Sequence, residues 1–344
     1  MTFSRYSLLL LSLLLVGQLQ AAAEQEEQLG DGMVNPGHHS QPAWFHQSFL
    51  DISEDVAEAA DGGKRILLYM YQDGCPYCGK MMQDNFGNRD VSAIALKHFN
   101  VIAINMWGDR EVTGLDGEVT TEKGFARSLG VQFTPTLIYL DEKGKVVLRL
   151  NGYYPPHQFM ATLKYVGNKL ESKEPFKDYY ARSNPVAASG KLHLESGFRS
   201  APFDLKPANK PLLVMFEQKQ CAACDELHQD ILKRPEVRKS FDQFDVALVD
   251  LWSKEPVVTP SGEKLKCNEW ITKLGVQHAP TMVFFDQQGK EVFRTNAFLQ
   301  AFHTHAVFDY VLTGAYKTQP EFQRFIQARA DALEAKGIHV DLMK

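Results

Sequence analysis

The architecture of this chain is set by the stretch Gly74-Cys75-Pro76-Tyr77-Cys78-Gly79, which has a counterpart in Cys221-Ala222-Ala223-Cys224. Two cysteines three positions apart at the start of a helix lie on one face, close enough to form a disulfide. The free N–H groups and partial positive charge of a helix N-terminus favour the thiolate form of the first cysteine. We therefore predict that Cys75 is the nucleophile and that Cys78 resolves the mixed disulfide.

The composition is that of an ordinary globular protein. The chain has 344 residues, of which 44% are hydrophobic and 23% are charged. A chain of this length is expected to hold about two domains. The formal net charge is −5 and the acidic and basic residues are interspersed, so the basic footprint of a nucleic-acid-binding protein is missing. We expect no nucleic-acid partner.

The N-terminus has the pattern of a secretory signal peptide. Arg5 precedes an apolar run over residues 8–16, and Ala21-Ala22-Ala23 offers small residues for cleavage. The run is shorter than the ~20 residues that a membrane-spanning helix needs, so an uncleaved anchor is the less favoured alternative. We predict a signal peptide over 1–23, a flexible lead-in over 24–44, and a periplasmic location. Because four of the five cysteines lie in the two motifs, redox chemistry is favoured over a disulfide scaffold.

The two cysteine motifs lie in two copies of one longer pattern. Leu274-Gly275-Val276-Gln277 repeats Leu129-Gly130-Val131-Gln132 letter for letter, and Pro280-Thr281 repeats Pro135-Thr136. Each copy reads strand, Cys-x-x-Cys helix, strand, helix, strand, strand, helix. This order predicts an α/β fold in which each copy has a mixed central sheet with helices on both faces. We place the first domain over 45–172, a linker over 173–200, the second domain over 201–335 and a C-terminal tail over 336–344.

Periodicity and capping signals predict the elements of the first copy. They comprise a helix over 51–63 with Ser53 as its N-cap, a buried strand over 65–71, a helix from Pro76, a helix over 91–99 capped by Asp90, a strand over 100–107, a loop over 108–119, a helix over 121–129, a hairpin of strands 137–140 and 146–150, and a helix over 156–170. Pro135 stands directly before a buried strand, which indicates a special backbone such as a cis bond.

A dithiol that follows a buried strand, with Pro-Thr before a later hairpin, resembles the thioredoxin superfamily. The tract from Asn105 to Thr113, with Asp116-Gly117-Glu118 and Gly152-Tyr153, looks like the exported SoxW-type thioredoxins. The resemblance is close over about 45–172 and looser over about 200–335. It implies two tandem thioredoxin-like domains that need no cofactor and exchange dithiols with protein disulfides, as a reductase.

The resemblance also assigns residues and partners. It makes Pro135 and Pro280 cis prolines that face the dithiols, with the backbone of Thr134 and Ala279 pairing with an extended substrate segment. Pro76 and Tyr77, between the first two cysteines, complete the expected substrate-binding set. A reductase in an oxidising compartment needs a membrane electron donor, and family analogy suggests partners in sulfur oxidation or cytochrome maturation.

One departure from the family concerns a buried acid. Many thioredoxins carry an acid six residues before the first cysteine, where this chain has Tyr69 and Met215. Glu217 is the candidate substitute in the second domain, although we favour a surface position for it.

The second motif leaves three interpretations open. Gln220 and Asp225 replace the flanking glycines of the first motif, and the proline after Cys221 is missing. The second domain is therefore either redox active or a redox-silent substrate-binding module. His278 and His228 near the motif leave a copper- or zinc-binding chaperone as a third interpretation, although we favour no metal.

The fifth cysteine, Cys267, has no partner in the sequence. It falls at the start of a predicted helix near the redox edge of the second sheet. We favour an unpaired thiol, and the alternative is a third redox cysteine that resolves disulfides with Cys221 or with another chain.

Overall fold

The computed structural model of the chain describes residues 40–183, 187–296 and 298–338. These residues belong to one compact unit, 35–344. The predicted signal peptide, most of the predicted lead-in and the end of the predicted tail lie outside the described residues. Within the described ranges, no helix combines the length and the apolar character that crossing a membrane requires.

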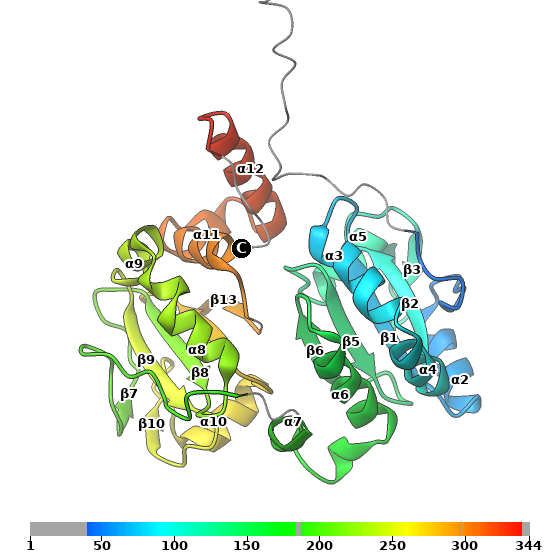
Figure 1. The fold of residues 1–344 in the computed structure, drawn as a ribbon, viewed down its shortest axis with the longest axis horizontal. Helices are drawn as coiled ribbons and strands as arrows, with labels where there is room; N and C mark the ends of the chain where they lie inside the picture. Colours follow the sequence, from blue (N-terminus) through cyan, green and yellow to red (C-terminus); the bar gives the residue numbers. More distant parts are fainter. Residues whose placement is uncertain (1–39, 184–186, 297, 339–344) are drawn as a thin grey trace, which may run out of the picture. The chain divides into compact units, whose positions relative to one another are not determined.

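The first domain is an α/β layer structure. Its elements are α2 (Ile52–Asp61), β1 (Arg65–Tyr71), α3 (Pro76–Lys80), the π-helix η1 (Met81–Phe86), α4 (Arg89–His98), β2 (Phe99–Asn105), β3 (Glu111–Thr113), β4 (Val119–Thr121), α5 (Glu122–Ser128), β5 (Thr136–Leu140), β6 (Val146–Asn151) and α6 (Pro156–Gly167). The main sheet has the order β2-β1-β5-β6 (Figure 1). β1 runs parallel to β2 and antiparallel to β5, so the sheet is mixed as predicted.

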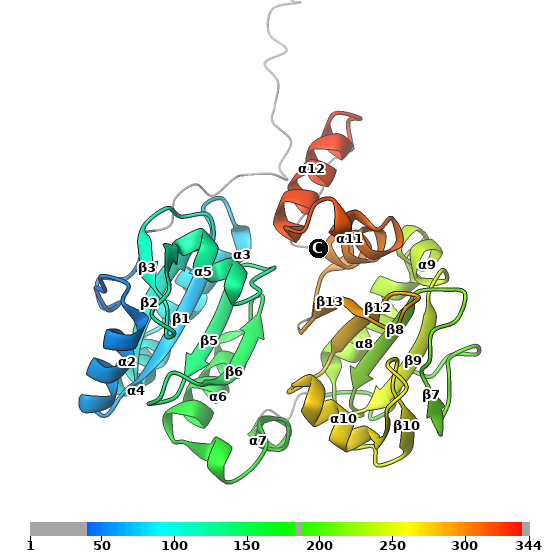
Figure 2. The ribbon, with the colours of Figure 1, turned by 180° about the vertical axis from the view of Figure 1, so that it is seen from behind.

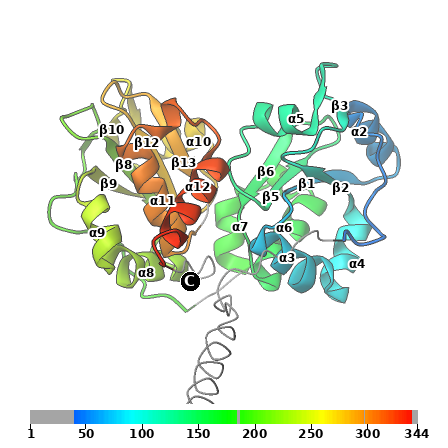
Figure 3. The same ribbon diagram turned by 90° about the horizontal axis from the view of Figure 1, so that it is seen from above.

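Strand β1 is buried along its whole length because helices cover both faces of the sheet. Successive side chains of a strand point to opposite faces. Leu67 and Tyr69 pack in one hydrophobic cluster with residues of α4 and α6, whereas Ile66 and Leu68 pack in another with residues of α2 and α5. Figure 3 shows these two helix layers on either side of the strands. The nearly continuous apolar run over 65–71 follows from this double coverage.

The second domain repeats this arrangement. Its elements are β7 (Phe203–Asp204), β8 (Leu212–Glu217), α8 (Ala222–Gln229), the 3-10 helix η3 (Ile231–Lys233), α9 (Pro235–Phe241), β9 (Asp245–Asp250), β10 (Pro256–Val258), β11 (Lys264–Lys266), α10 (Cys267–Leu274), β12 (Thr281–Phe285), β13 (Glu291–Thr295), α11 (Ala301–Leu312), the 3-10 helix η4 (Ala315–Lys317) and α12 (Phe322–Glu334). The sheet order β13-β12-β8-β9 matches that of the first domain (Figure 2). The predicted duplication and fold class are confirmed.

Several local predictions are wrong in detail. Asp51, and not Ser53, caps α2, because its carboxylate accepts hydrogen bonds from the backbone N–H groups of Ser53 and Glu54. Asn88, and not Asp90, caps α4 in the same way. The predicted loop over 108–119 contributes to a hairpin of β3 and β4. The predicted linker contains helix α7 (Phe176–Ser183).

Candidate functional site

The first dithiol lies just beyond the carboxyl end of β1. Cys75 is the N-cap of α3, and its Sγ accepts a hydrogen bond from the backbone N–H of Cys78 at 3.1 Å. The two cysteines form a disulfide with their Cα atoms 5.2 Å apart. Cys75 is 4% exposed and Cys78 is 0% exposed. The first sulfur of the pair is therefore the one that an incoming substrate can reach.

The loop before β5 lies against this disulfide. The Thr134–Pro135 peptide bond is cis, as predicted. The Thr134 hydroxyl donates to Cys75 Sγ at 3.4 Å, and the Thr134 carbonyl oxygen lies 3.4 Å from the same sulfur. The hydroxyl of Thr136 donates to the Phe133 carbonyl at 2.8 Å, which holds the loop in place. The structure thus brings together the dithiol and the predicted pairing residue Thr134.

The second dithiol has the same construction. Cys221 is the N-cap of α8, its Sγ accepts from the backbone N–H of Cys224 at 3.0 Å, and the Cα atoms of the disulfide are 5.2 Å apart. Cys221 is 7% exposed and Cys224 is 0% exposed. The Ala279–Pro280 bond is cis, as predicted. The two motifs therefore share the N-cap hydrogen bond and the Cα–Cα distance although the second lacks the helix-favouring proline, whereas the backbone φ angle differs, at −85° for Cys75 and −147° for Cys221.

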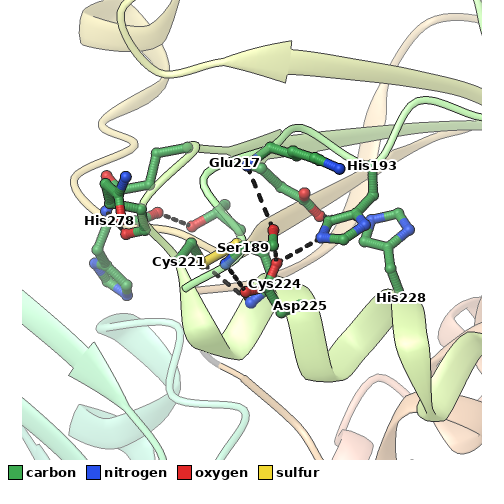
Figure 4. The surroundings of a disulfide bond; sticks show 12 residues. Ser189, His193, Glu217, Cys221, Cys224, Asp225, His228 and His278 are labelled. Carbon is green, nitrogen blue, oxygen red and sulfur yellow. Dashed lines mark hydrogen bonds and ion pairs between the residues drawn. A yellow bond between two sulfur atoms is a disulfide. The ribbon is translucent and has the colours of Figure 1, made fainter. Parts of the chain in front are cut away.

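Glu217 is buried behind the second dithiol, so the surface position predicted for it is wrong. Its side chain is 1% exposed, and its Oε1 lies 2.9 Å from Nε2 of His228. His228 is on α8, four residues after Cys224, so the side chains of Cys224 and His228 lie on the same buried face of that helix. Burial of a carboxylate is strongly unfavourable without a partner, and His228 is that partner. Figure 4 shows this group of side chains around the disulfide.

The predicted linker contributes to the second site, which sequence reasoning missed. Ser189 donates to Asp225 through both its backbone N–H and its hydroxyl, each at 2.6 Å, and His193 Nε2 lies 2.6 Å from the same carboxylate. Burial alone would raise the pKa of Asp225, but these hydrogen bonds outweigh it and lower the pKa. The ring of His193 also stacks on that of His228, with centroids 4.8 Å apart (Figure 4). Asp225, which replaces a flanking glycine, thus anchors the linker to α8.

The side chains considered as metal ligands at the second dithiol make other contacts in the described structure. His278 directs Nε2 to the carbonyl oxygen of Asn296, and burial lowers the pKa of its imidazole. Cys221 and Cys224 are bonded to each other. Across the described part of the chain, no group of three or more histidine, cysteine, aspartate or glutamate side chains is arranged to hold a metal ion.

Cys267 packs in a different hydrophobic cluster from the helix that carries the second dithiol. It begins α10 as predicted, but its side chain is 0% exposed. It packs in a hydrophobic cluster with Val214 and Trp270, whereas Leu227 of the dithiol helix packs in the cluster on the other face of β8. Burial raises the pKa of the Cys267 thiol, which disfavours the reactive thiolate. These observations favour the unpaired structural thiol over a third redox cysteine.

A cavity of about 730 Å³ collects most of the residues predicted to contact substrate. Pro76, Tyr77, Thr134, Ala279 and Pro280 line it, whereas Pro135 is not among its described lining residues.

The chain matches known proteins at the level of the domain family. A sequence model of the thioredoxin-like domain family matches residues 52–167 and 199–312. No match was found among curated protein sequences. The two matched ranges fall on the two copies of the sequence repeat.

Solved structures with similarity to the chain include three from bacteria. A thioredoxin-fold protein from Helicobacter pylori is 21% identical, with 40% of this chain and 92% of that chain covered and a TM-score of 0.35. A thioredoxin from Thermus thermophilus is 25% identical, with 34% and 83% covered and a TM-score of 0.28. A disulphide isomerase from Xylella fastidiosa Temecula1 is 17% identical, with 38% and 86% covered and a TM-score of 0.23.

Proposed function

Because the chain belongs to the thioredoxin-like domain family, we propose that it is a thiol–disulfide oxidoreductase that acts on protein disulfides. The observation that carries this proposal is the arrangement of the two cysteines at the N-terminus of each dithiol helix. In both motifs the second cysteine's N–H donates to the first sulfur, and the second cysteine is fully buried. That N–H stabilises negative charge on the first sulfur, and burial restricts the second sulfur to a resolving role.

The exchange on the first domain runs in two steps. The Cys75 thiolate attacks one sulfur of a substrate disulfide, forms a mixed disulfide and releases the other substrate sulfur as a thiolate. Cys78 then bonds to Cys75 and releases the second substrate thiol, so two electrons pass from the dithiol to the substrate. The proximity of Thr134 to Cys75 Sγ supports a role for the Thr134 backbone in holding the substrate beside the reacting sulfur.

The test is the reduction of insulin disulfides in the presence of a chemical reductant. A Cys221→Ser, Cys224→Ser chain isolates the turnover of the first domain. Adding Cys75→Ser to that chain removes the nucleophile, so we expect turnover to fall to background. Cys267→Ala is the matched control, because that thiol is fully buried and is bonded to neither dithiol. Undiminished turnover when Cys75→Ser is added to the Cys221→Ser, Cys224→Ser chain would refute the proposal. The Cys221→Ser, Cys224→Ser chain by itself measures the share of the second domain.

The same proposal includes the direction and place of the reaction. The SoxW-type motifs support a reductase, and the apolar run with Ala21-Ala22-Ala23 supports export to the periplasm. A reductase there depends on a membrane electron donor, and partners in sulfur oxidation or cytochrome maturation follow from the family analogy. Redox titration of each dithiol tests the direction: a reductase requires a potential below that of its substrate disulfides.

A further inference from the structure

The cavity of about 730 Å³ is lined by both dithiols. Cys75 and Cys221 are among its lining residues, whereas the fully buried Cys78 and Cys224 are not. In each pair, the sulfur available for the first attack therefore opens on the same space.

The backbone segments that we expect to pair with substrate also line this cavity. Thr134 and Ala279, each followed by a cis proline, both line the cavity. Thr134 contacts the sulfur of Cys75 directly. An extended segment bound in the cavity therefore meets a backbone edge and a reactive sulfur from each domain.

The walls of the cavity combine aromatic and amide side chains with two acidic residues, Asp73 and Glu226, and two basic residues, Lys80 and Arg324, so the charges balance and favour neither sign of substrate. Its aromatic lining side chains include Tyr77, Tyr153, Tyr154, Phe298 and His303. Its amide side chains include Gln72, Gln218, Gln220, Gln300 and Gln323. Burial lowers the pKa of His303 to about 4, so this imidazole is neutral at neutral pH. Aromatic walls accept apolar side chains, and amides exchange hydrogen bonds with a peptide backbone.

The size of the cavity limits what it can hold. Its volume of about 730 Å³ lies within the range of roughly 300–1,000 Å³ typical of sites for small ligands. A segment of a few residues fits such a space, and a folded domain does not. The substrate must therefore present its disulfide on an unfolded or extended stretch of chain.

The wall that carries Thr134 is held by the C-terminal helix α12. The backbone N–H of Phe322 donates to the side chain of Gln132 at 3.2 Å, and the side chain of Gln323 donates to the Gln132 carbonyl at 3.1 Å. The ring of Phe133 packs edge-on against that of Phe322, with centroids 5.3 Å apart. These contacts hold the pairing edge of the first domain against the second.

We propose that this cavity is a single substrate site for an extended, disulfide-bearing polypeptide segment, and that both dithiols act on the segment bound there. The proposal rests on the proposed thiol–disulfide exchange. At either dithiol, the first thiolate bonds to one substrate sulfur as the substrate S–S bond breaks, and the displaced sulfur leaves as a thiolate that takes up a proton. The second cysteine then bonds to the first, and the substrate leaves fully reduced as the dithiol is oxidised.

The first experiment measures whether the two nucleophilic sulfurs share one space. In a full chain with Cys78→Ala and Cys224→Ala, a short-arm bismaleimide should join Cys75 to Cys221 within one molecule. Mass spectrometry identifies the linked peptides, and tenfold dilution of the protein should leave the yield unchanged. The control carries Cys78→Ala, Cys221→Ala and Cys224→Ala, and should show no link from Cys75 to the buried Cys267. If no intramolecular link forms between Cys75 and Cys221, the shared cavity is refuted.

The second experiment measures occupancy by a peptide. The probe has the insulin B-chain sequence with serine in place of cysteine, so that it binds without reacting. We expect saturating peptide to slow the alkylation of Cys75 and of Cys221 about tenfold, with the same half-saturating concentration at both. Different half-saturating concentrations, or protection of one cysteine only, would mean two separate sites. Equal protection by S-methylglutathione would assign the cavity to small thiols and overturn the polypeptide.

Both measurements are independent of turnover. Loss of insulin reduction in the Cys75→Ser chain tests the proposed function, whereas linking and protection test the cavity alone. Circular dichroism checks the fold of the alanine variants, and Cys78→Ser with Cys224→Ser provides a second pair for the same measurements. An exchange enzyme with two separate sites would lose insulin reduction on Cys75→Ser as expected, but it would show neither the Cys75–Cys221 link nor equal protection of the two cysteines.

Discussion

The carboxylate of Glu217 and the imidazole of His228 are buried against each other behind the second dithiol. Their side chains are 1% and 2% exposed, and the pair is joined at 2.9 Å. Glu195 of the predicted linker lies 3.9 Å from Nδ1 of His228 and is itself paired with Arg238. Because water is excluded from the pair, each member depends on the other for hydrogen bonding.

Substitution of Glu217 tests this dependence. Glu217→Leu leaves the buried Nε2 of His228 without its partner, so we expect a loss of about 1–3 kcal/mol in the free energy of unfolding. Glu217→Gln keeps a hydrogen-bonding group at the same position and should lose less. Urea unfolding of both variants measures the difference. Equal losses in the two variants would show that the hydrogen bond does not stabilise this site.

At the scale of elements, strand β1 is tied to its neighbours by one buried arginine. Arg65 begins the strand, and its guanidinium donates to both carboxylate oxygens of Glu142 at 3.0 Å and to the Val166 carbonyl at 2.7 Å. It also pairs with Glu171 at 2.7 Å. Hydrogen bonds from Arg65 lower the pKa of Glu142 to about 2. One side chain therefore joins β1 to the β5–β6 turn and to the end of α6.

Removal of Arg65 should destabilise the first domain in a pH-dependent way. We expect Arg65→Met to lower the free energy of unfolding by about 1–3 kcal/mol at pH 7. The lowered pKa of Glu142 means that the stabilisation from this pair is fully present above its ordinary pKa of 4.5 and is lost as the pH falls toward about 2. The gap between variant and wild type should therefore narrow in acid, as measured by urea unfolding across this pH range.

The matched control is Arg89→Met, which removes an exposed arginine from the start of α4. It should change the stability little at any of these pH values. An Arg65→Met deficit that is the same at pH 7 and at pH 3 would contradict the role given to Glu142.

The sequence predicts elements well where the signal is local. The apolar run over 65–71 predicts the whole of β1, and the turn at Asp141 to Gly144 predicts the β5–β6 hairpin. The sequence does not predict the β3–β4 hairpin, because each strand has only three residues, of which one is buried in β3 and none in β4. Short strands of this kind owe their pairing to tertiary context rather than to periodicity.

At the scale of the whole molecule, the loop before β5 of the first domain packs into the hydrophobic core of the second domain. Phe133 is 5% exposed and belongs to a cluster of second-domain residues. Its ring lies 5.7 Å from that of Phe293 and 5.3 Å from that of Phe322. Gln72 near the first dithiol also receives a hydrogen bond from the indole of Trp107, which lies under Arg324 of α12.

Truncation of Phe133 should uncouple the two domains. Phe133→Ala removes a buried ring shared by both, at a cost of about 3 kcal/mol. We expect the wild-type chain to unfold in one calorimetric transition and the variant in two, because the domains then melt separately. Phe49→Ala is the control, since that side chain is fully exposed. A variant that still unfolds in a single transition with wild-type midpoint would contradict the coupling.

The resemblance to thioredoxins implied the cis bonds at Pro135 and Pro280 but not the one at Pro202. The sequence alone determined the duplication, the α/β class and the two dithiols. Each of these depends on residues close together in the chain, on their periodicity, or on the spacing that the two copies share. The disulfides and the cis bonds at Pro135 and Pro280 are where the repeat predicts them.

Only the tertiary structure decided what surrounds the dithiols. Glu217 is a residue type that is almost never fully buried without a partner, and that partner, His228, comes from a separate element. Ser189 and His193 reach Asp225 from the linker, and Phe133 reaches Phe322 across the domain boundary. Such contacts join segments far apart in the sequence and are selected by packing and by the desolvation of polar groups, which no local pattern records.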